Sequence, residues 1–356
     1  MKILYVNSTR RWGGVKTWCL RSAVGLSALG HEIVVAGRRG DPFLDACRDA
    51  GLPVLAVAFG ASWSPATFLF FWRHLRRLGT QLVVCNTGRD LSTAGLAARV
   101  AGVPVIHRVG AGSDFRDTWA RRRTHRAIVQ WVLAPAEVVR CELLARFPWI
   151  RRSQVLVSWN AADALPQGGG GLANRIVCLA RLCPGKGLES LLFAAAILRD
   201  RGLDFQLDLA GEGSLEAKLR VEVQCLGLEE RVRFPGFVRP SAGILSLAGI
   251  GVLPSLREGF PNTLIEYWAA GLAVAASDLP GVREAVGERG TALLFPPGQA
   301  QEMAAALERL LTDEPLREDL AARGLAQARE HFSAAQEARR LEALYAACLA
   351  LPRQAG

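Results

Sequence analysis

Residues 258–266 read Glu-Gly-Phe-Pro-Asn-Thr-Leu-Ile-Glu, with a carboxylate at each end of the stretch. The Gly-Phe-Pro turn precedes a helix that we predict from about Asn262 to Ala270, because the next residue, Gly271, is of a type that ends helices. Asn262 and Glu266 would then share one helix face. The first N–H groups of a helix have no partner within it and can bind phosphate or sugar oxygens. The stretch therefore predicts a site with amides for phosphate and carboxylates for sugar hydroxyls.

A second motif lies upstream, where residues 180–187 read Ala-Arg-Leu-Cys-Pro-Gly-Lys-Gly. It follows an apolar run, 175–179, and precedes a segment with helical spacing, 188–199. Arg181 and Lys186 are then on a loop at the carboxyl end of a strand, where open α/β sheets bind ligands. Two cations there can neutralise a diphosphate. Each motif alone is compatible with solvated surface charges, whereas the two together favour a nucleotide-sugar site.

Strand and helix patterns alternate along the chain, which predicts parallel sheets covered by helices. The predicted strands are 3–6, 32–36, 82–85, 103–108, 155–158, 175–179, 205–209, 232–234, 250–254, 273–276 and 292–295. Four glycines at 168–171 are typical of a flexible linker. A chain of 356 residues suits two domains. We predict an α/β protein with two Rossmann-like, doubly wound parallel-sheet domains, 1–165 and 166–334.

The chain resembles the retaining GT-B glycosyltransferases, a large family that includes sucrose synthases and bacterial cell-surface sugar transferases. The family pattern has Arg-x4-Lys-Gly, then Gly-Glu-Gly or Gly-Asp-Gly, then Glu-x7-Glu. This sequence has, in that order, Arg181-x4-Lys186-Gly187, Gly211-Glu212-Gly213 and Glu258-x7-Glu266. The resemblance covers most of residues 175–330. In the first half it rests on residues 1–6 followed by Gly13-Gly14, on 29–31, and on Asn160-Ala-Ala-Asp163, where the family more often has Asn-Gly-x-Asp.

The resemblance implies two domains facing across a cleft, with the donor on the second domain and the acceptor on the first. It implies that helix 335–356 packs back on the first domain and that the anomeric configuration is retained. The expected catalytic residues are Arg181, Lys186, Glu258 and His107. The expected donor-binding residues are Gly13, Gly14, Arg181, Lys186, Gly211, Glu212, Gly213, Glu258, Gly259, Phe260, Pro261, Asn262, Thr263 and Glu266.

Two of these positions leave alternatives open. His107 ends a predicted strand of the acceptor domain, so it either lines the cleft or packs within the fold. Gly13-Gly14 either lets the backbone approach a ligand closely or forms a plain strand-to-helix turn. This loop is not a Gly-x-Gly-x-x-Gly fingerprint, which argues against a nicotinamide-dependent oxidoreductase. That oxidoreductase and a nucleotide-sugar epimerase remain the alternative functions.

No Asp-x-Asp occurs in the sequence. We therefore expect Arg181 and Lys186, rather than a metal ion, to stabilise the leaving diphosphate. No cofactor is expected beside the donor, a UDP-, GDP- or ADP-linked sugar. The eight cysteines include no Cys-x-x-Cys pair, which favours reduced thiols in the cytoplasm.

The net positive charge comes from the first half of the chain. Residues 1–165 contain 23 Lys and Arg against 10 Asp and Glu, a net charge of +13, and the remainder has −3. No nucleic-acid module is recognisable. The charge therefore favours an anionic membrane surface or a phosphorylated acceptor, such as a lipid-linked glycan in lipopolysaccharide synthesis.

Residues 65–78 predict a helix with an aromatic face and flanking arginines, which suits either a membrane interface or the core. No stretch reaches the ~18 apolar residues of a membrane span. No signal peptide is evident. The expected location is the cytoplasm, with a peripheral place on the inner face of the cytoplasmic membrane as an open alternative.

Overall fold

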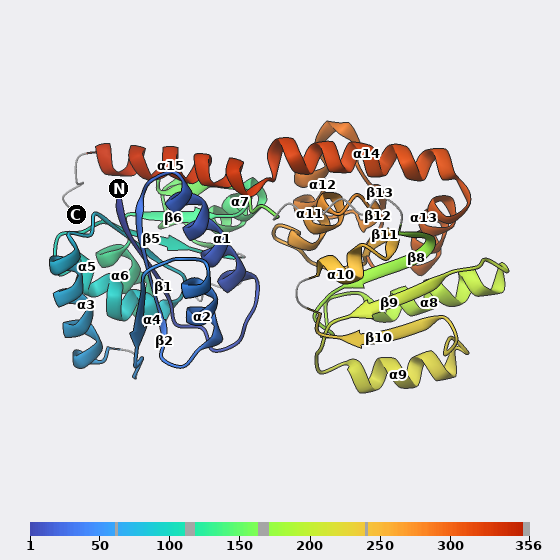
Figure 1. Cartoon of the computed structure of the whole chain (residues 1–356), viewed down its shortest axis with the longest axis horizontal. Helices are drawn as coiled ribbons and strands as arrows, with labels where there is room; N and C mark the ends of the chain where they lie inside the picture. The colour runs from blue at the N-terminus through green and yellow to red at the C-terminus, as the bar shows by residue number, and fades with distance from the viewer. Residues whose placement is uncertain (61–62, 111–117, 163–170, 239–240, 352–356) are drawn as a thin grey trace. The chain divides into compact units, whose positions relative to one another are not determined.

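The computed structural model describes residues 1–60, 63–110, 118–162, 171–238 and 241–351. The chain divides into two compact units (Figure 1). Unit 1 comprises Met1–Asn160 and Ala334–Gly356, and unit 2 comprises Ala161–Ser333. The boundary predicted at 165/166 lies outside the described residues, as do Asp163 and most of the glycine run.

Unit 1 is built on a parallel sheet in the order β3-β2-β1-β4-β5-β6-β7. Its strands are β1 (Lys2–Asn7), β2 (Glu32–Arg38), β3 (Val54–Val57), β4 (Leu82–Cys85), β5 (Val105–Arg108), β6 (Trp131–Ala134) and β7 (Val155–Val157). Because helices cover both faces, the strands are short apolar runs, and Ile3 to Val6 of β1 are at most 2% exposed. The sequence-based assignment missed β3 and β6, each of which has only four residues.

Helices connect these strands. They are α1 (Gly14–Ala28), α2 (Pro42–Asp49), α3 (Pro65–Leu78), α4 (Gly88–Asp90), η1 (Leu91–Gly95), α5 (Leu96–Val100), α6 (Trp119–Ile128), α7 (Glu137–Arg146), η3 (Arg152–Gln154) and α15 (Ala334–Ala350). Several of these helices are preceded by a capping residue whose side chain accepts a hydrogen bond from a backbone amide of the first turn. Asp41 caps α2 in this way, and Ser64 caps α3. Pro65 is at the first position of α3, where its missing N–H costs no hydrogen bond.

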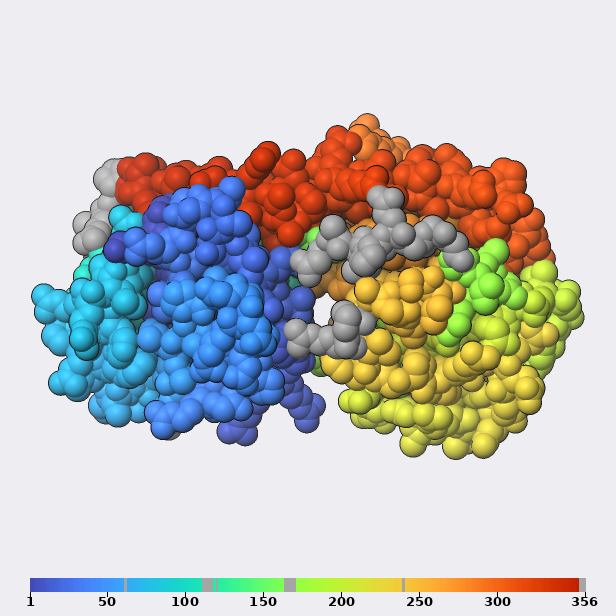
Figure 2. All heavy atoms as spheres, in the orientation of Figure 1, coloured from blue at the N-terminus to red at the C-terminus, as the bar shows by residue number. Residues whose placement is uncertain are grey.

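The last helix, α15, packs on α1 within unit 1, where its red atoms lie against blue ones in Figure 2. The hydroxyls of Tyr345 and Tyr5 are 3.1 Å apart in the core. Arg21 Nε donates to Glu337 Oε2 over 3.0 Å, and the Glu337 side chain is only 1% exposed. A segment distant in sequence thus completes the core of unit 1.

Unit 2 repeats the design with a parallel sheet in the order β10-β9-β8-β11-β12-β13. Its strands are β8 (Leu172–Leu179), β9 (Gln206–Ala210), β10 (Val232–Gly236), β11 (Ala248–Leu253), β12 (Ala273–Ser277) and β13 (Leu293–Phe295). Its helices are α8 (Leu188–Asp200), α9 (Glu216–Cys225), α10 (Ala242–Leu245), α11 (Asn262–Ala269), α12 (Pro280–Val286), η4 (Gly287–Arg289), α13 (Ala300–Thr312) and α14 (Glu314–His331).

Both sheets are doubly wound, because the first strand of each unit lies inside its sheet and the chain moves outward on both sides of it. In such sheets ligands bind at the carboxyl ends of the strands, where the winding reverses. This point lies between β1 and β4 in unit 1 and between β8 and β11 in unit 2. The predicted fold class is confirmed. None of the helices in the described ranges is long and apolar enough to cross a membrane.

Candidate active site

Three loops of unit 2 meet at the carboxyl ends of β8, β9 and β11. The loop after β8, which carries Arg181 and Lys186, is bonded to the turn after β9, since Leu182 N donates to Glu212 O over 2.9 Å. The same loop meets the segment after β11, where Leu256 N donates to Gly185 O over 2.9 Å. The structure therefore brings the three predicted motifs together at one edge of the sheet.

Glycines permit this close approach. A Cβ at Gly211 would overlap the carbonyl oxygen of Ala180, and one at Gly187 would overlap that of Pro254. Gly187 also has φ +66°, a left-handed conformation that favours glycine. Any larger residue at either position would separate the loops that carry the charged side chains.

Lys186 and Glu258 form an ion pair, with Nζ to Oε1 at 2.6 Å and both side chains partly buried. Ser255 Oγ donates to the same carboxylate oxygen over 2.7 Å. Arg181 is exposed, and the described part of the chain gives its side chain no ion-pair partner. The site therefore combines a positioned lysine with an arginine whose guanidinium faces solvent.

Helix α11 begins at Asn262, as predicted, directly after the loop that carries Glu258. Asn262 and Glu266 are one turn apart, and Ser241 Oγ donates to Glu266 Oε2 over 3.4 Å. The amide of Asn262 donates to Phe260 O over 3.1 Å, so it is engaged within the turn. Phe260 and Pro261 are buried, and the Phe260 ring packs against Phe332. Gly259 and Thr263 are half-buried on either side of them.

Tyr267 connects α11 to the sheet by hydrogen bonds, a role that was not predicted from the sequence. Its hydroxyl accepts from Leu179 N over 2.7 Å and donates to Val252 O over 3.3 Å. These backbone groups lie at the ends of β8 and β11, the strands beside the predicted ligand crevice. A buried tyrosine one position after Glu266 was the available signal, because a buried phenol requires a hydrogen-bond partner.

In unit 1, Gly13 and Gly14 start α1 at the carboxyl end of β1. Gly13 is extended, with φ −178°, and no side chain caps the helix. Lys16, in the first turn, is buried and pairs with Asp41 Oδ2 at 2.5 Å. This ion pair fixes the helix start beside α2.

His107 is the last residue but one of β5 and is only 7% exposed. Its ring centroid is 5.6 Å from that of His125 on α6, and the His125 ring is 5.3 Å from the Trp149 indole. Burial lowers the pKa of His107 to about 4, with a smaller contribution from the nearby Arg108 charge. Burial likewise lowers the pKa of His125 well below its usual value. Both rings are therefore neutral near neutral pH.

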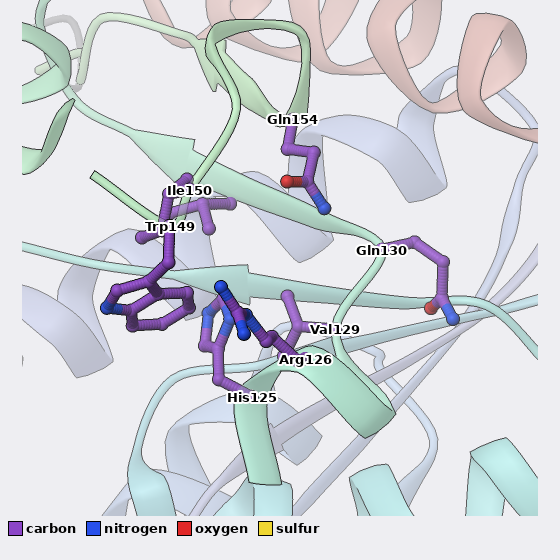
Figure 3. Close-up of a pocket in the computed structure, with 8 residues that line it drawn as sticks. His125, Arg126, Val129, Gln130, Trp149, Ile150 and Gln154 are labelled. Carbon is purple, nitrogen blue, oxygen red and sulfur yellow. The ribbon is translucent and has the colours of Figure 1, made fainter. Parts of the chain in front are cut away.

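A cavity of about 20 Å³ lies beside His125 (Figure 3). It is lined by His125, Arg126, Val129, Gln130, Val132, Trp149, Ile150 and Gln154. The volume is enough for about one water molecule, not for a sugar. His107 is not part of the lining, so the structure places it in a packed aromatic cluster next to α6.

Two family models match the chain. The model described as "Glycosyl transferases group 1" matches residues 173–313, and that described as "Glycosyltransferase Family 4" matches residues 12–164. The matches and the fold together identify the chain as a glycosyltransferase with the GT-B fold. They favour transfer over the oxidoreductase and epimerase alternatives.

The chain is also similar to individual proteins that are named as sugar transferases. The chain is 28% identical over 313 residues to alpha-D-kanosaminyltransferase of Streptomyces kanamyceticus, covering 76% of this chain and 81% of the relative. It is 38% identical over 149 residues to amylovoran biosynthesis glycosyltransferase AmsK of Erwinia amylovora, covering 39% of this chain but only 36% of that relative. A solved structure of Anabaena HepE in complex with UDP-glucose superposes with a TM-score of 0.82 at 18% identity, covering 97% of this chain and 100% of the other.

Proposed function

We propose that the protein transfers a sugar from a nucleotide-sugar donor to a glycan acceptor in the synthesis of a cell-surface polysaccharide or lipopolysaccharide, with retention of anomeric configuration. The observation that carries this proposal is the meeting of Arg181, the Lys186–Glu258 pair and α11 at the carboxyl edge of the unit 2 sheet. The Anabaena relative in complex with UDP-glucose supports a nucleotide-sugar donor. The name of the Erwinia relative supports the polysaccharide context.

Departure of a nucleoside diphosphate builds negative charge on its β-phosphate. Arg181 and Lys186 would stabilise this charge as it develops, with help from backbone amides near Gly259 and Thr263. Glu258 holds the ammonium group of Lys186 in place, and Ser255 donates to the same carboxylate oxygen of Glu258. Glu266 would accept hydrogen bonds from the ribose hydroxyls of the donor. Gly211, Glu212 and Gly213 form the adjoining turn.

The acceptor would bind to unit 1. His107, whose ring is neutral, is proposed as a catalytic side chain on the acceptor side. Gly13-Gly14 stay proposed as donor-binding residues, at a place where the backbone can approach a ligand. A lipid-linked acceptor on the inner face of the cytoplasmic membrane would suit the positive charge of this half. The side chains of Arg73, Arg76 and Arg77 on α3 are exposed, whereas Phe71 and Leu75 of the same helix are buried. Helix α3 thus has a core face and a basic face.

A thermal-shift panel of UDP, GDP, ADP and their sugars tests donor binding. One nucleoside diphosphate should raise the melting temperature, because a ligand that binds only the folded state stabilises it. If none of them does, the proposed donor site is wrong.

Metal independence is tested by transfer in excess EDTA. Turnover should persist, because two cationic side chains are proposed to stabilise the leaving group. Loss of turnover that returns on adding magnesium or manganese would contradict this proposal. NMR of the product, compared with the donor, reports whether the anomeric configuration is retained.

A further inference from the structure

Three arginines gather at the carboxyl edge of the unit 1 sheet. Arg38 is the last residue of β2, Arg10 follows the end of β1, and Arg89 follows the end of β4. These strands are adjacent in the order β2-β1-β4. Arg10, on the loop after β1, and Arg89, in α4 directly after β4, therefore flank the point where the winding of the sheet reverses, which is where such sheets bind ligands.

The loops that carry these arginines are fixed to one another. The buried Asp90 carboxylate accepts from Ser8 N over 3.0 Å and from Asn86 N over 3.1 Å, which joins the ends of β1 and β4. Arg38 Nε donates to Ser8 O over 2.7 Å, which joins β2 to the same loop. The arginines are thus presented by a preformed edge.

Arg38 is itself held in place. Its guanidinium lies over the Phe59 ring, with 5.5 Å between Cζ and the ring centroid, and only Nε bonds to the backbone. Within the described ranges, its two terminal nitrogens have no hydrogen-bond partner. A planar guanidinium stacked in this way is suited to bidentate binding of a phosphate.

The local charge is not neutralised by protein carboxylates. Among the residues that the structure describes, none of Arg10, Arg38 and Arg89 forms an ion pair with an Asp or Glu side chain. Asp41 pairs with Lys16, and Asp90 is buried against backbone amides. Burial lowers the pKa of Arg38, and the charges of Arg89 and Arg10 lower it further, which indicates that the three cations act on one another.

We propose that Arg10, Arg38 and Arg89 bind a phosphate or diphosphate group carried by the acceptor. This inference rests on the proposed function, in which unit 1 holds the acceptor, and adds the chemical class of that acceptor. The group could belong to a lipid diphosphate or to a soluble sugar phosphate, and both share the chemistry that three guanidinium groups recognise. Arg10, Arg38 and Arg89 belong to unit 1, whereas Arg181 and Lys186 belong to unit 2.

The test uses the full chain saturated with the nucleoside diphosphate found in the donor screen, so that the unit 2 site is filled. Inorganic pyrophosphate and farnesyl diphosphate are then titrated by calorimetry. The double substitution Arg10→Gln/Arg89→Gln should weaken pyrophosphate binding at least about tenfold, because each removed group can form charge-assisted hydrogen bonds. The matched control is Arg11→Gln/Arg39→Gln, which removes the same charge from neighbouring exposed residues.

Weaker binding in the first variant alone supports the site, whereas equal weakening in both variants, or in neither, overturns it. Tighter binding of farnesyl diphosphate than of pyrophosphate assigns the phosphate to a lipid, and equal binding assigns it to a soluble acceptor. Binding of the nucleoside diphosphate is measured in every variant. Its absence from the wild type would refute the proposed donor site, and the comparison of the two double variants would still test unit 1, because both variants leave unit 2 unchanged.

Discussion

Lys186 illustrates how one side chain can be positioned for charge stabilisation. Glu258, which also accepts from Ser255, fixes its ammonium group at the edge where the diphosphate would leave. We predict that Lys186→Ala lowers kcat for transfer by roughly a hundredfold or more, since one group that stabilises developing charge contributes ~3 kcal/mol. Lys218→Ala is the matched control, because Lys218 pairs with Glu189 on the surface of the same unit. Surface pairs contribute little, so its kcat should stay near that of the wild type. Similar losses in both variants would contradict the assigned role.

Glu266 is predicted to recognise ribose rather than phosphate. Glu266→Ala should weaken binding of the nucleoside diphosphate, because hydrogen bonds from sugar hydroxyls to a carboxylate are lost. Calorimetry with the 2′-deoxy nucleotide sharpens the test. The wild type should prefer the ribonucleotide, and the variant should lose part of this preference while its melting temperature without ligand changes little. An unchanged preference would rule out the ribose contact.

The roles of some site residues could be predicted from the sequence, and those of others could not, for physical reasons. Lys186 and Glu258 are 72 residues apart, yet their motifs follow strands of one parallel sheet, so their meeting was predictable. The role of Tyr267 could not be predicted, because its hydrogen-bond partners are backbone groups of two strands. The sequence placed His107 correctly at a strand end. It could not show that the His107 ring packs against His125, whose own ring packs against Trp149.

At the level of secondary-structure elements, β5 and α6 are in contact through the buried rings of His107 and His125. The pKa of His107 is about 4 and that of His125 is also lowered, whereas unfolded histidine titrates near 6.5. Between these pH values the unfolded chain binds more protons than the folded one, so the free energy of unfolding should fall as pH falls from about 6.5 towards 4. Asp90 opposes this trend, because burial raises its pKa to about 6, but a single carboxyl opposes two imidazoles.

The measurement is the unfolding midpoint near pH 7 and near pH 5, compared between the wild type and His125→Gln. The drop on acidification should be smaller in the variant, and the difference between the two drops cancels the contribution of other groups. His331→Gln, at a half-exposed position in unit 2, is the control. An equal drop in the wild type and His125→Gln would exclude a buried, neutral His125.

Element boundaries were predictable where local signals were strong. Helix α3 begins at Pro65 and ends before Gly79, the limits that the sequence predicted. Strands β3 and β6 carry no such signals. Val54–Val57 and Trp131–Ala134 are too short for a clear period, and their strand state comes from pairing with β2 and β5.

For the whole molecule, the uneven charge predicts reversible binding to anionic membranes. The substitution of Arg73, Arg76 and Arg77 together by Glu should release the protein from anionic vesicles at low salt, because each basic residue near such a surface contributes about 1 kcal/mol. Donor binding should be unchanged. The control substitutes three exposed arginines of unit 2, Arg233, Arg309 and Arg329, in the same way. Failure of the wild type to co-sediment at low salt would refute membrane binding, and equal release by both triple variants would refute a role for α3.

The packing of α15 on unit 1 affects how the protein folds during its synthesis. Unit 2 is continuous in sequence, so all of its strands have been synthesised once residue 333 leaves the ribosome. Unit 1 begins first but lacks Glu337 and Tyr345 until α15 has been synthesised, and the Tyr5–Tyr345 contact spans 340 residues. The N-terminal half of a nascent chain therefore keeps the α1 surface uncovered while the later half folds. A chaperone should bind the uncovered α1 surface, or a protease should cleave it, only until α15 has emerged from the ribosome.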